Sequence, residues 1–182
     1  MKKGGIGLNI FTIRMLGSVL IMLCSAKIGF EEAGRFKRRV EEIREFQTAL
    51  VALKGEICFC RSPLAEALVK TGERLETAVA EIFITAGKAI GRGEAAARTA
   101  WETAVFSTQK KLALKNGELH VINTFGGLLG ISDEAGQLEN IELTTAKLIA
   151  CEKKAAEDEQ KNSKVYKSLG IAAGIFLAII FI

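Results

Sequence analysis

Apolar residues recur at helical spacing through the middle of the chain. Between residues 31 and 58 they follow one another at steps of three, four or seven, and the set is Phe36, Val40, Ile43, Leu50, Leu53 and Ile57. This spacing places the set on one face of a helix. We therefore predict an amphipathic helix there, with Glu41, Glu42 and Glu45 on its solvated side.

Further helices follow with the same spacing. Ser62-Pro63 predicts a new start, with serine as the N-cap and proline in the first helical position, and the helix should run to about Gly72. Three more helices are predicted at residues 74–88, 94–108 and 116–129. We expect Trp101 in the core of the bundle, and Gly126 and Gly127 to permit a close helix contact.

A long helix is predicted at the end of the chain, because no proline interrupts residues 132–182. Its first part carries a core stripe, Leu138, Ile141, Thr145 and Leu148. The charged segment 151–164 offers little to bury and predicts a solvated stalk. The predicted fold class is thus all-α, a compact bundle of about six helices at residues 31–150 whose last helix continues into the C-terminal segment.

Both ends of the chain are apolar. Residues 165–182 predict a C-terminal transmembrane helix, with Tyr166 at the interface and Lys167 extending toward the headgroups. A buried core helix is the alternative. Residues 1–30 predict an N-terminal membrane anchor, for which a cleaved signal peptide is the competing interpretation. Basic residues follow the first segment and precede the second, which predicts a cytoplasmic bundle.

Composition agrees with apolar ends on a charged middle. The chain has 182 residues, of which 49% are hydrophobic and 25% charged, and its mean hydropathy is +0.24. The net charge of +4 is small, and basic residues alternate with acidic ones, so neither the total nor the pattern favours nucleic-acid binding. Four cysteines without paired spacing do not predict a disulfide framework.

No motif in the sequence predicts catalysis or a cofactor. His120 has no histidine or cysteine at ligand spacing, and Cys58 and Cys60 are separated by one residue rather than the two of zinc and redox motifs. Residues 87–93 are glycine-rich but lack the order of a phosphate loop. We therefore expect a non-enzymatic protein without a catalytic, metal or cofactor site and without a small-molecule substrate.

One series of short motifs resembles the stage III sporulation protein AB family. The most specific part is Leu129-Gly130-Ile131-Ser132-Asp133 followed by Gln137, and the Ser62-Pro63-Leu64 turn and Tyr166-Lys167-Ser168-Leu169-Gly170 occur in the same order as in that family. The resemblance covers nearly the whole chain. Two features depart from it, the extra residues at 1–14 and the thiols of Cys58 and Cys60.

The resemblance implies a platform or assembly component of the secretion-like channel between mother cell and forespore, similar in fold to type II secretion F platform proteins. Expected partners are other stage III sporulation channel proteins, a secretion-type ATPase and membrane lipid, and the expected location is the mother-cell membrane facing the forespore. We expect two exposed groups to contribute protein contacts: Ser62, Pro63 and Leu64, and Ser132, Asp133 and Gln137. The alternative function is a membrane-tethered helical adaptor or regulator that binds a soluble partner.

Overall fold

The computed structural model describes residues 10–130 and 134–181, without the side chains of residues 10–14, 134, 178, 180 and 181. Within these ranges all regular structure is helical, which confirms the predicted all-α class. The helices are α1 (Ile10–Cys58), α2 (Leu64–Gly72), α3 (Val79–Gly91), α4 (Ala97–Thr108), the short 3₁₀ helix η1 (Gln109–Lys111), α5 (Asn116–Gly126) and α6 (Glu134–Phe181).

The chain divides into two compact units. We call Arg38–Glu157 the bundle, and the described parts of Met1–Lys37 and Asp158–Ile182 the terminal pair. Helices α1 and α6 each contribute one segment to each unit. The two units are therefore described separately.

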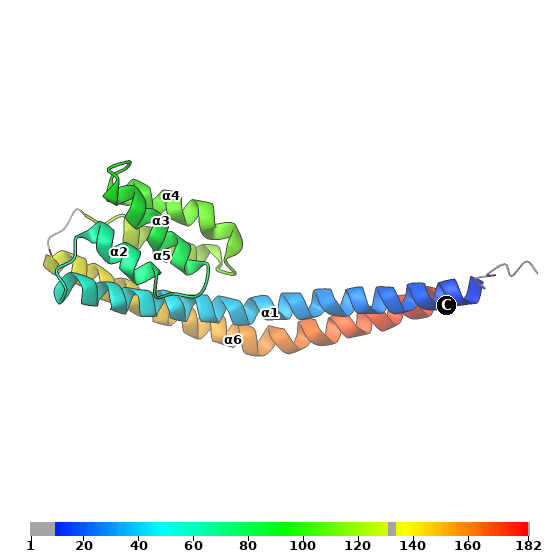
Figure 1. The fold of residues 1–182 in the computed structure, drawn as a ribbon. Helices are drawn as coiled ribbons and strands as arrows, with labels where there is room; N and C mark the ends of the chain where they lie inside the picture. Colours follow the sequence, from blue (N-terminus) through cyan, green and yellow to red (C-terminus); the bar gives the residue numbers. More distant parts are fainter. Residues whose placement is uncertain (1–9, 131–133, 182) are drawn as a thin grey trace, which may run out of the picture. The chain divides into compact units, whose positions relative to one another are not determined.

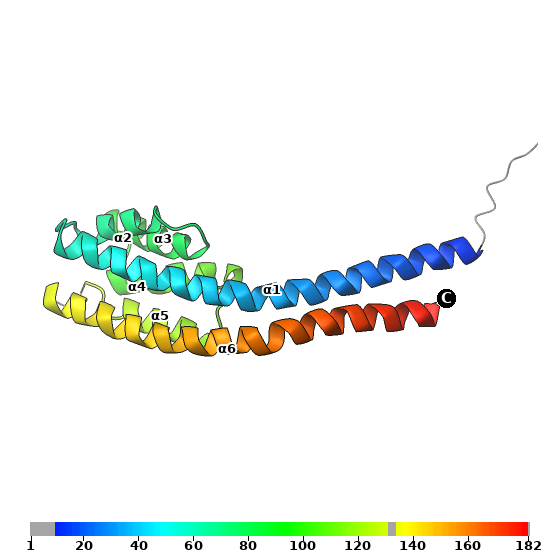
Figure 2. The ribbon, with the colours of Figure 1, turned by 90° about the horizontal axis from the view of Figure 1, so that it is seen from below.

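In the bundle, helices α2 to α5 lie together on one side of the antiparallel segments of α1 and α6 (Figures 1 and 2). Helix α2 packs on α3, α3 on α4 and α4 on α5. Two ion pairs fix the register of α1 against α6, one between Arg44 and Glu152 at 2.6 Å and one between Lys54 and Glu142 at 2.7 Å. The predicted stripe of α1 is buried at Val40, Ile43, Leu50 and Leu53.

Four aromatic rings form the centre of this core. Trp101 is fully buried, and its ring meets those of Phe46, Phe83 and Phe125 at centroid distances of 6.1, 5.1 and 5.2 Å. The indole N–H donates to the carbonyl of Ile122 at 2.9 Å. A Cβ on Gly126 would lie 2.0 Å from Trp101 Cδ1. The close contact predicted for Gly126 is confirmed, and it is a contact with Trp101.

Three helix starts differ from the prediction. Helix α4 begins at Ala97 rather than residue 94, and the starts of α2 and α3 differ because the chain before them is held by α1. Helix α2 begins at Leu64 with Pro63 as its N-cap, so Ser62 is not the cap. Helix α3 begins at Val79 rather than residue 74. The Glu45 carboxylate accepts the backbone N–H groups of Glu76 and Thr77, at 2.6 and 3.0 Å, which keeps these residues in a turn.

Helix α6 is continuous, as predicted, but it packs in the core farther than residue 150. Ala155 is buried, and Cys151 and Ala156 pack against the core cluster. The predicted stalk at 151–164 therefore contributes to the bundle in its first turns. Of the predicted core stripe, Ile141 and Leu148 are buried.

The terminal pair consists of residues 10–37 of α1 and 158–181 of α6, which run side by side in Figures 1 and 2. Their backbones approach closely at two glycines, since a Cβ on Gly29 would lie 2.8 Å from the Cα of Gly170. Ser25 Oγ donates to the carbonyl of Gly170 at 2.9 Å. Small residues of this kind allow two helices to pack backbone against backbone.

Large apolar side chains cover the outside of the terminal pair. The most exposed include Leu16, Leu20, Leu23, Ile28, Leu169, Phe176 and Ile179. In the described ranges, however, no helix combines the length and the apolar character that crossing a bilayer requires. The predicted transmembrane helix at 165–182 is therefore not supported. The predicted anchor at 1–30 lies partly outside the described residues.

Candidate protein-contact site

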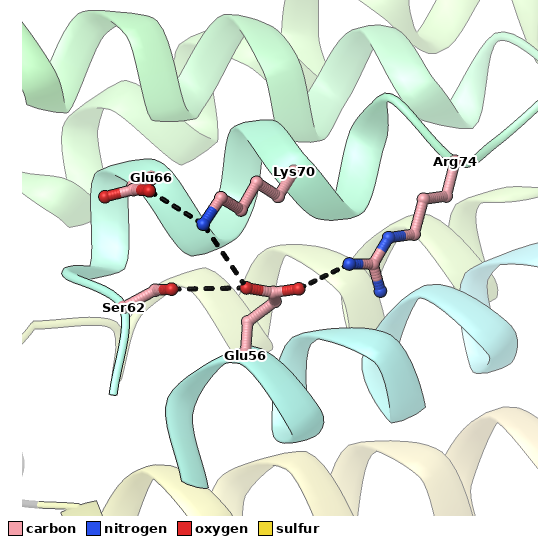
Figure 3. A network of polar contacts seen from close by, with 5 residues as sticks. All are labelled: Glu56, Ser62, Glu66, Lys70 and Arg74. Atoms are coloured by element: carbon pink, nitrogen blue, oxygen red, sulfur yellow. Dashed lines mark hydrogen bonds and ion pairs between the residues drawn. The ribbon is translucent and has the colours of Figure 1, made fainter. Parts of the chain in front are cut away.

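A buried carboxylate organises the junction between α1 and α2. Glu56 is 3% exposed and accepts hydrogen bonds from Ser62 Oγ at 3.2 Å and from Arg74 Nη2 at 2.5 Å (Figure 3). Lys70 Nζ lies 3.9 Å from Glu56 and 2.7 Å from Glu66. A buried carboxylate is costly to ionise unless donors surround it, and these donors come from the turn before α2, from its last turn and from the segment after it.

The turn held by Glu56 is tight and presents several side chains to solvent. The Ser62 N–H donates to the Glu56 carbonyl at 3.0 Å, and Arg61 adopts a left-handed φ of 49°. Phe59 is 87% exposed, and Cys60 and Pro63 are exposed as well. A fixed turn with an exposed aromatic ring suits a protein contact, because little conformational entropy is lost when a partner binds it.

The structure separates the first predicted contact group. Only Pro63 is exposed; Ser62 is half-buried in the Glu56 network, and Leu64 packs against the core. Sequence reasoning missed Phe59 and Glu56. The signal for Phe59 was an aromatic residue directly after the end of a predicted helix, where no stripe requires it.

The second predicted group is described only in part. Ser132 and Asp133 lie outside the described residues. Gln137 is 7% exposed, so the expectation of an exposed face at this position is wrong. Asn140 and Thr144 are buried on the same side of α6, and Asn140 Nδ2 donates to the Phe125 carbonyl at 3.0 Å. These polar residues belong to the packing of α6. The role of both groups as protein contacts stays a prediction.

Two further acidic residues, Glu42 and Glu118, are buried. Of these, Glu42 was predicted to be solvated. Glu42 accepts the backbone N–H of Ala113 at 2.7 Å, and burial raises the pKa of its carboxyl above the ordinary value. Glu118 binds Arg39 at 2.5 Å, with both side chains almost fully buried, and accepts the N–H of Lys115 at 2.7 Å. The expectation that Glu42 is solvated is wrong, because its partner lies far away in sequence.

A shallow cleft lies between α4 and α5 of the bundle. Its volume is about 470 Å³, and its lining residues are Glu102, Thr103, Phe106, Gln109 and Asn123. Phe106 is 74% exposed. The sequence had not indicated this cleft, since its residues come from α4, η1 and α5 and carry no motif.

Groups that could support chemistry are dispersed in the bundle. The described residues contain no cluster of three or more metal-ligating side chains. His120 is exposed on α5, and Cys24, Cys58, Cys60 and Cys151 are free thiols. Burial raises the pKa of the Cys151 thiol, which disfavours the reactive thiolate.

Comparisons with known proteins agree with the resemblance seen in the motifs. The sequence model of the family described as stage III sporulation protein AB matches residues 14–182. The chain is 33% identical over 168 residues to the stage III sporulation protein AB of Bacillus subtilis strain 168, covering 92% of this chain and 98% of the relative. A solved structure of a stage III sporulation protein AB superposes with a TM-score of 0.63 at 31% identity, covering 68% of this chain and 98% of that chain.

Proposed function

Because the chain belongs to the stage III sporulation protein AB family, we propose that it is a non-enzymatic platform component of a secretion-like channel between mother cell and forespore. In this role the bundle presents fixed surfaces on which other stage III sporulation proteins and a secretion-type ATPase assemble. The observation that carries the proposal is the turn at residues 59–63, where the ring of Phe59 is exposed and Ser62 is bound by the buried carboxylate of Glu56.

The proposal also assigns a role to the terminal pair. Its exposed apolar side chains favour contact with lipid, since burying such surface is worth about 25 cal/mol per Å². We place the terminal pair against the mother-cell membrane that faces the forespore, and the bundle on the cytoplasmic side. A platform held by two chain segments has less rotational freedom than one held by a single segment, which suits repeated stacking of subunits.

The test is affinity purification from sporulating cells with the tagged full-length chain. We expect other stage III sporulation proteins in the eluate, and we expect Phe59→Ser to reduce their recovery and the spore yield. Val51→Ser is the matched control, because it removes another exposed apolar side chain, on the bundle part of α1 and away from the turn and the cleft. Equal recovery with both variants, or an eluate without sporulation proteins from the unmodified chain, contradicts the proposal.

A second candidate function is an adaptor or regulator that binds a soluble partner. The cleft beside Phe106 favours it, because its shallow, partly apolar lining fits a peptide segment. The two functions differ in a deletion strain. Loss of a platform should prevent assembly of the channel proteins into one complex, whereas loss of a regulator should leave the complex intact and change its activity.

A further inference from the structure

Three lysines lie on the part of α6 that precedes its apolar end. Lys161, Lys164 and Lys167 follow one another at steps of three residues, and all three are exposed. No acidic residue occurs in segment 160–167. None of the three lysines makes an ion pair with a carboxylate among the described residues, so their charges are directed to solvent or to a binding partner.

Arg35 brings a fourth cation to the same level of the terminal pair. The neighbouring ring of Phe36 contacts the ring of Tyr166 on α6 with a centroid distance of 5.5 Å. Arg35 is exposed and pairs with Glu32 at 3.2 Å, which offsets its charge in part. Lys37, which follows Phe36 on α1, is exposed too, so the three lysines of α6 supply the larger part of the positive charge at this level.

The side chains along the terminal pair are ordered like the layers of a bilayer surface. The exposed apolar residues of α6 in the terminal pair begin at Val165 and continue from Leu169 to Ile179, and those of α1 end at Phe30. Tyr166 and the three lysines thus lie at the start of this apolar part of α6. At about 1.5 Å per residue, segment 161–167 spans roughly 9 Å, close to the headgroup layer of about 5–7 Å on each side of the hydrocarbon.

We propose that Lys161, Lys164 and Lys167 form a lysine belt that binds the phosphate groups of anionic phospholipids. The proposal rests on the lipid association assigned to the terminal pair under the proposed function. A lysine near an anionic membrane surface contributes about 1 kcal/mol, and tyrosine is favoured at the interface. Three such lysines would strengthen binding to an anionic surface by up to about 100-fold over a neutral one, and added salt should reduce the difference.

Vesicle flotation with the full-length protein, diluted from detergent, tests the belt. The probes are vesicles of phosphatidylcholine alone and vesicles with about one third phosphatidylglycerol. We expect the unmodified chain to bind the anionic vesicles between about 10- and 100-fold more tightly, and K161Q/K164Q/K167Q to lose most of this preference. The control K88Q/K110Q/K147Q removes the same charge from exposed lysines of the bundle and should keep the preference.

The possible outcomes separate this proposal from the one on which it rests. If the unmodified chain binds both vesicle types equally, or if both triple variants lose the preference alike, the lysine belt is wrong and the lipid association stands. If the chain binds neither type, the lipid association itself is contradicted, and the belt with it.

Discussion

Replacing Gly126 by alanine should loosen the centre of the bundle. The added Cβ would lie 2.0 Å from Trp101 Cδ1 and 2.4 Å from Trp101 Cγ, distances that force the indole ring to move. The ring is enclosed by Phe46, Phe83 and Phe125, and its N–H donates to Ile122, so displacement disturbs several contacts at once.

The expected cost follows from three terms. Overpacking a core costs about 1–3 kcal/mol, and loss of the indole hydrogen bond adds about 0.5–1.5 kcal/mol. Alanine regains up to about 1 kcal/mol through its helix propensity. The free energy of unfolding of the bundle should therefore fall by about 2 kcal/mol, which corresponds to a decrease in Tm of roughly 8 °C.

Denaturant unfolding of the full-length protein in detergent measures this effect. Trp101 is the single tryptophan of the chain, so its fluorescence reports on the bundle. Gly117→Ala is the matched control, because it lies on the same helix and its Cβ would meet nothing within 4 Å. It should leave stability unchanged or raise it by up to about 1 kcal/mol. An unchanged midpoint for Gly126→Ala would refute the close packing.

Three further substitutions test other parts of the structure. Gly170→Ala places a Cβ 2.8 Å from the Cα of Gly29 and should lower the Tm of the detergent-bound protein, measured by far-UV circular dichroism. The control Gly34→Ala, whose Cβ meets nothing within 4 Å, should leave the Tm unchanged, and equal Tm values for the two variants would contradict the pairing. The raised pKa of Glu42 stabilises the fold fully below the ordinary value of 4.5, and that stability is lost as pH rises through the folded pKa. Between about pH 4.5 and 7 the free energy of unfolding should therefore fall less for Glu42→Gln than for the unmodified chain. Denaturant unfolding at each pH measures this, and parallel curves of the two proteins would contradict it. Glu56→Ala should destabilise the bundle by about 1–2 kcal/mol and make the backbone after Phe59 sensitive to limited proteolysis, since it leaves Ser62 and Arg74 without their acceptor; an unchanged cleavage pattern would argue against the network.

Local signals predicted several helix limits well. The ends at Cys58, Gly72 and Thr108 and the start at Asn116 follow from glycine, proline and asparagine positions and from the apolar stripes. The core position of Trp101 and the close contact at Gly126 were also predicted. Each prediction used the type of one residue in one helix, a large aromatic residue in α4 and a glycine in α5.

The features that sequence did not predict depend on partners distant along the chain. Glu42, Glu45 and Glu56 lie between the positions of the core stripe of α1. Glu42 binds a donor before α5, and Glu45 and Glu56 bind donors between α2 and α3. Neither charge nor spacing reveals which loop will approach. Gln137 was expected to be exposed because it is polar, yet α6 buries its polar side against the bundle. The sequence did not predict the exposure of Phe59, because that exposure depends on the course of the turn after α1.

Crosslinking mass spectrometry on sporulating membranes tests the platform role most directly. With the full-length chain at its natural level, we predict crosslinks from the bundle to other stage III sporulation proteins, concentrated near the exposed turn at Phe59. Crosslinks confined to the chain itself, in cells that assemble the other channel proteins normally, would contradict the account.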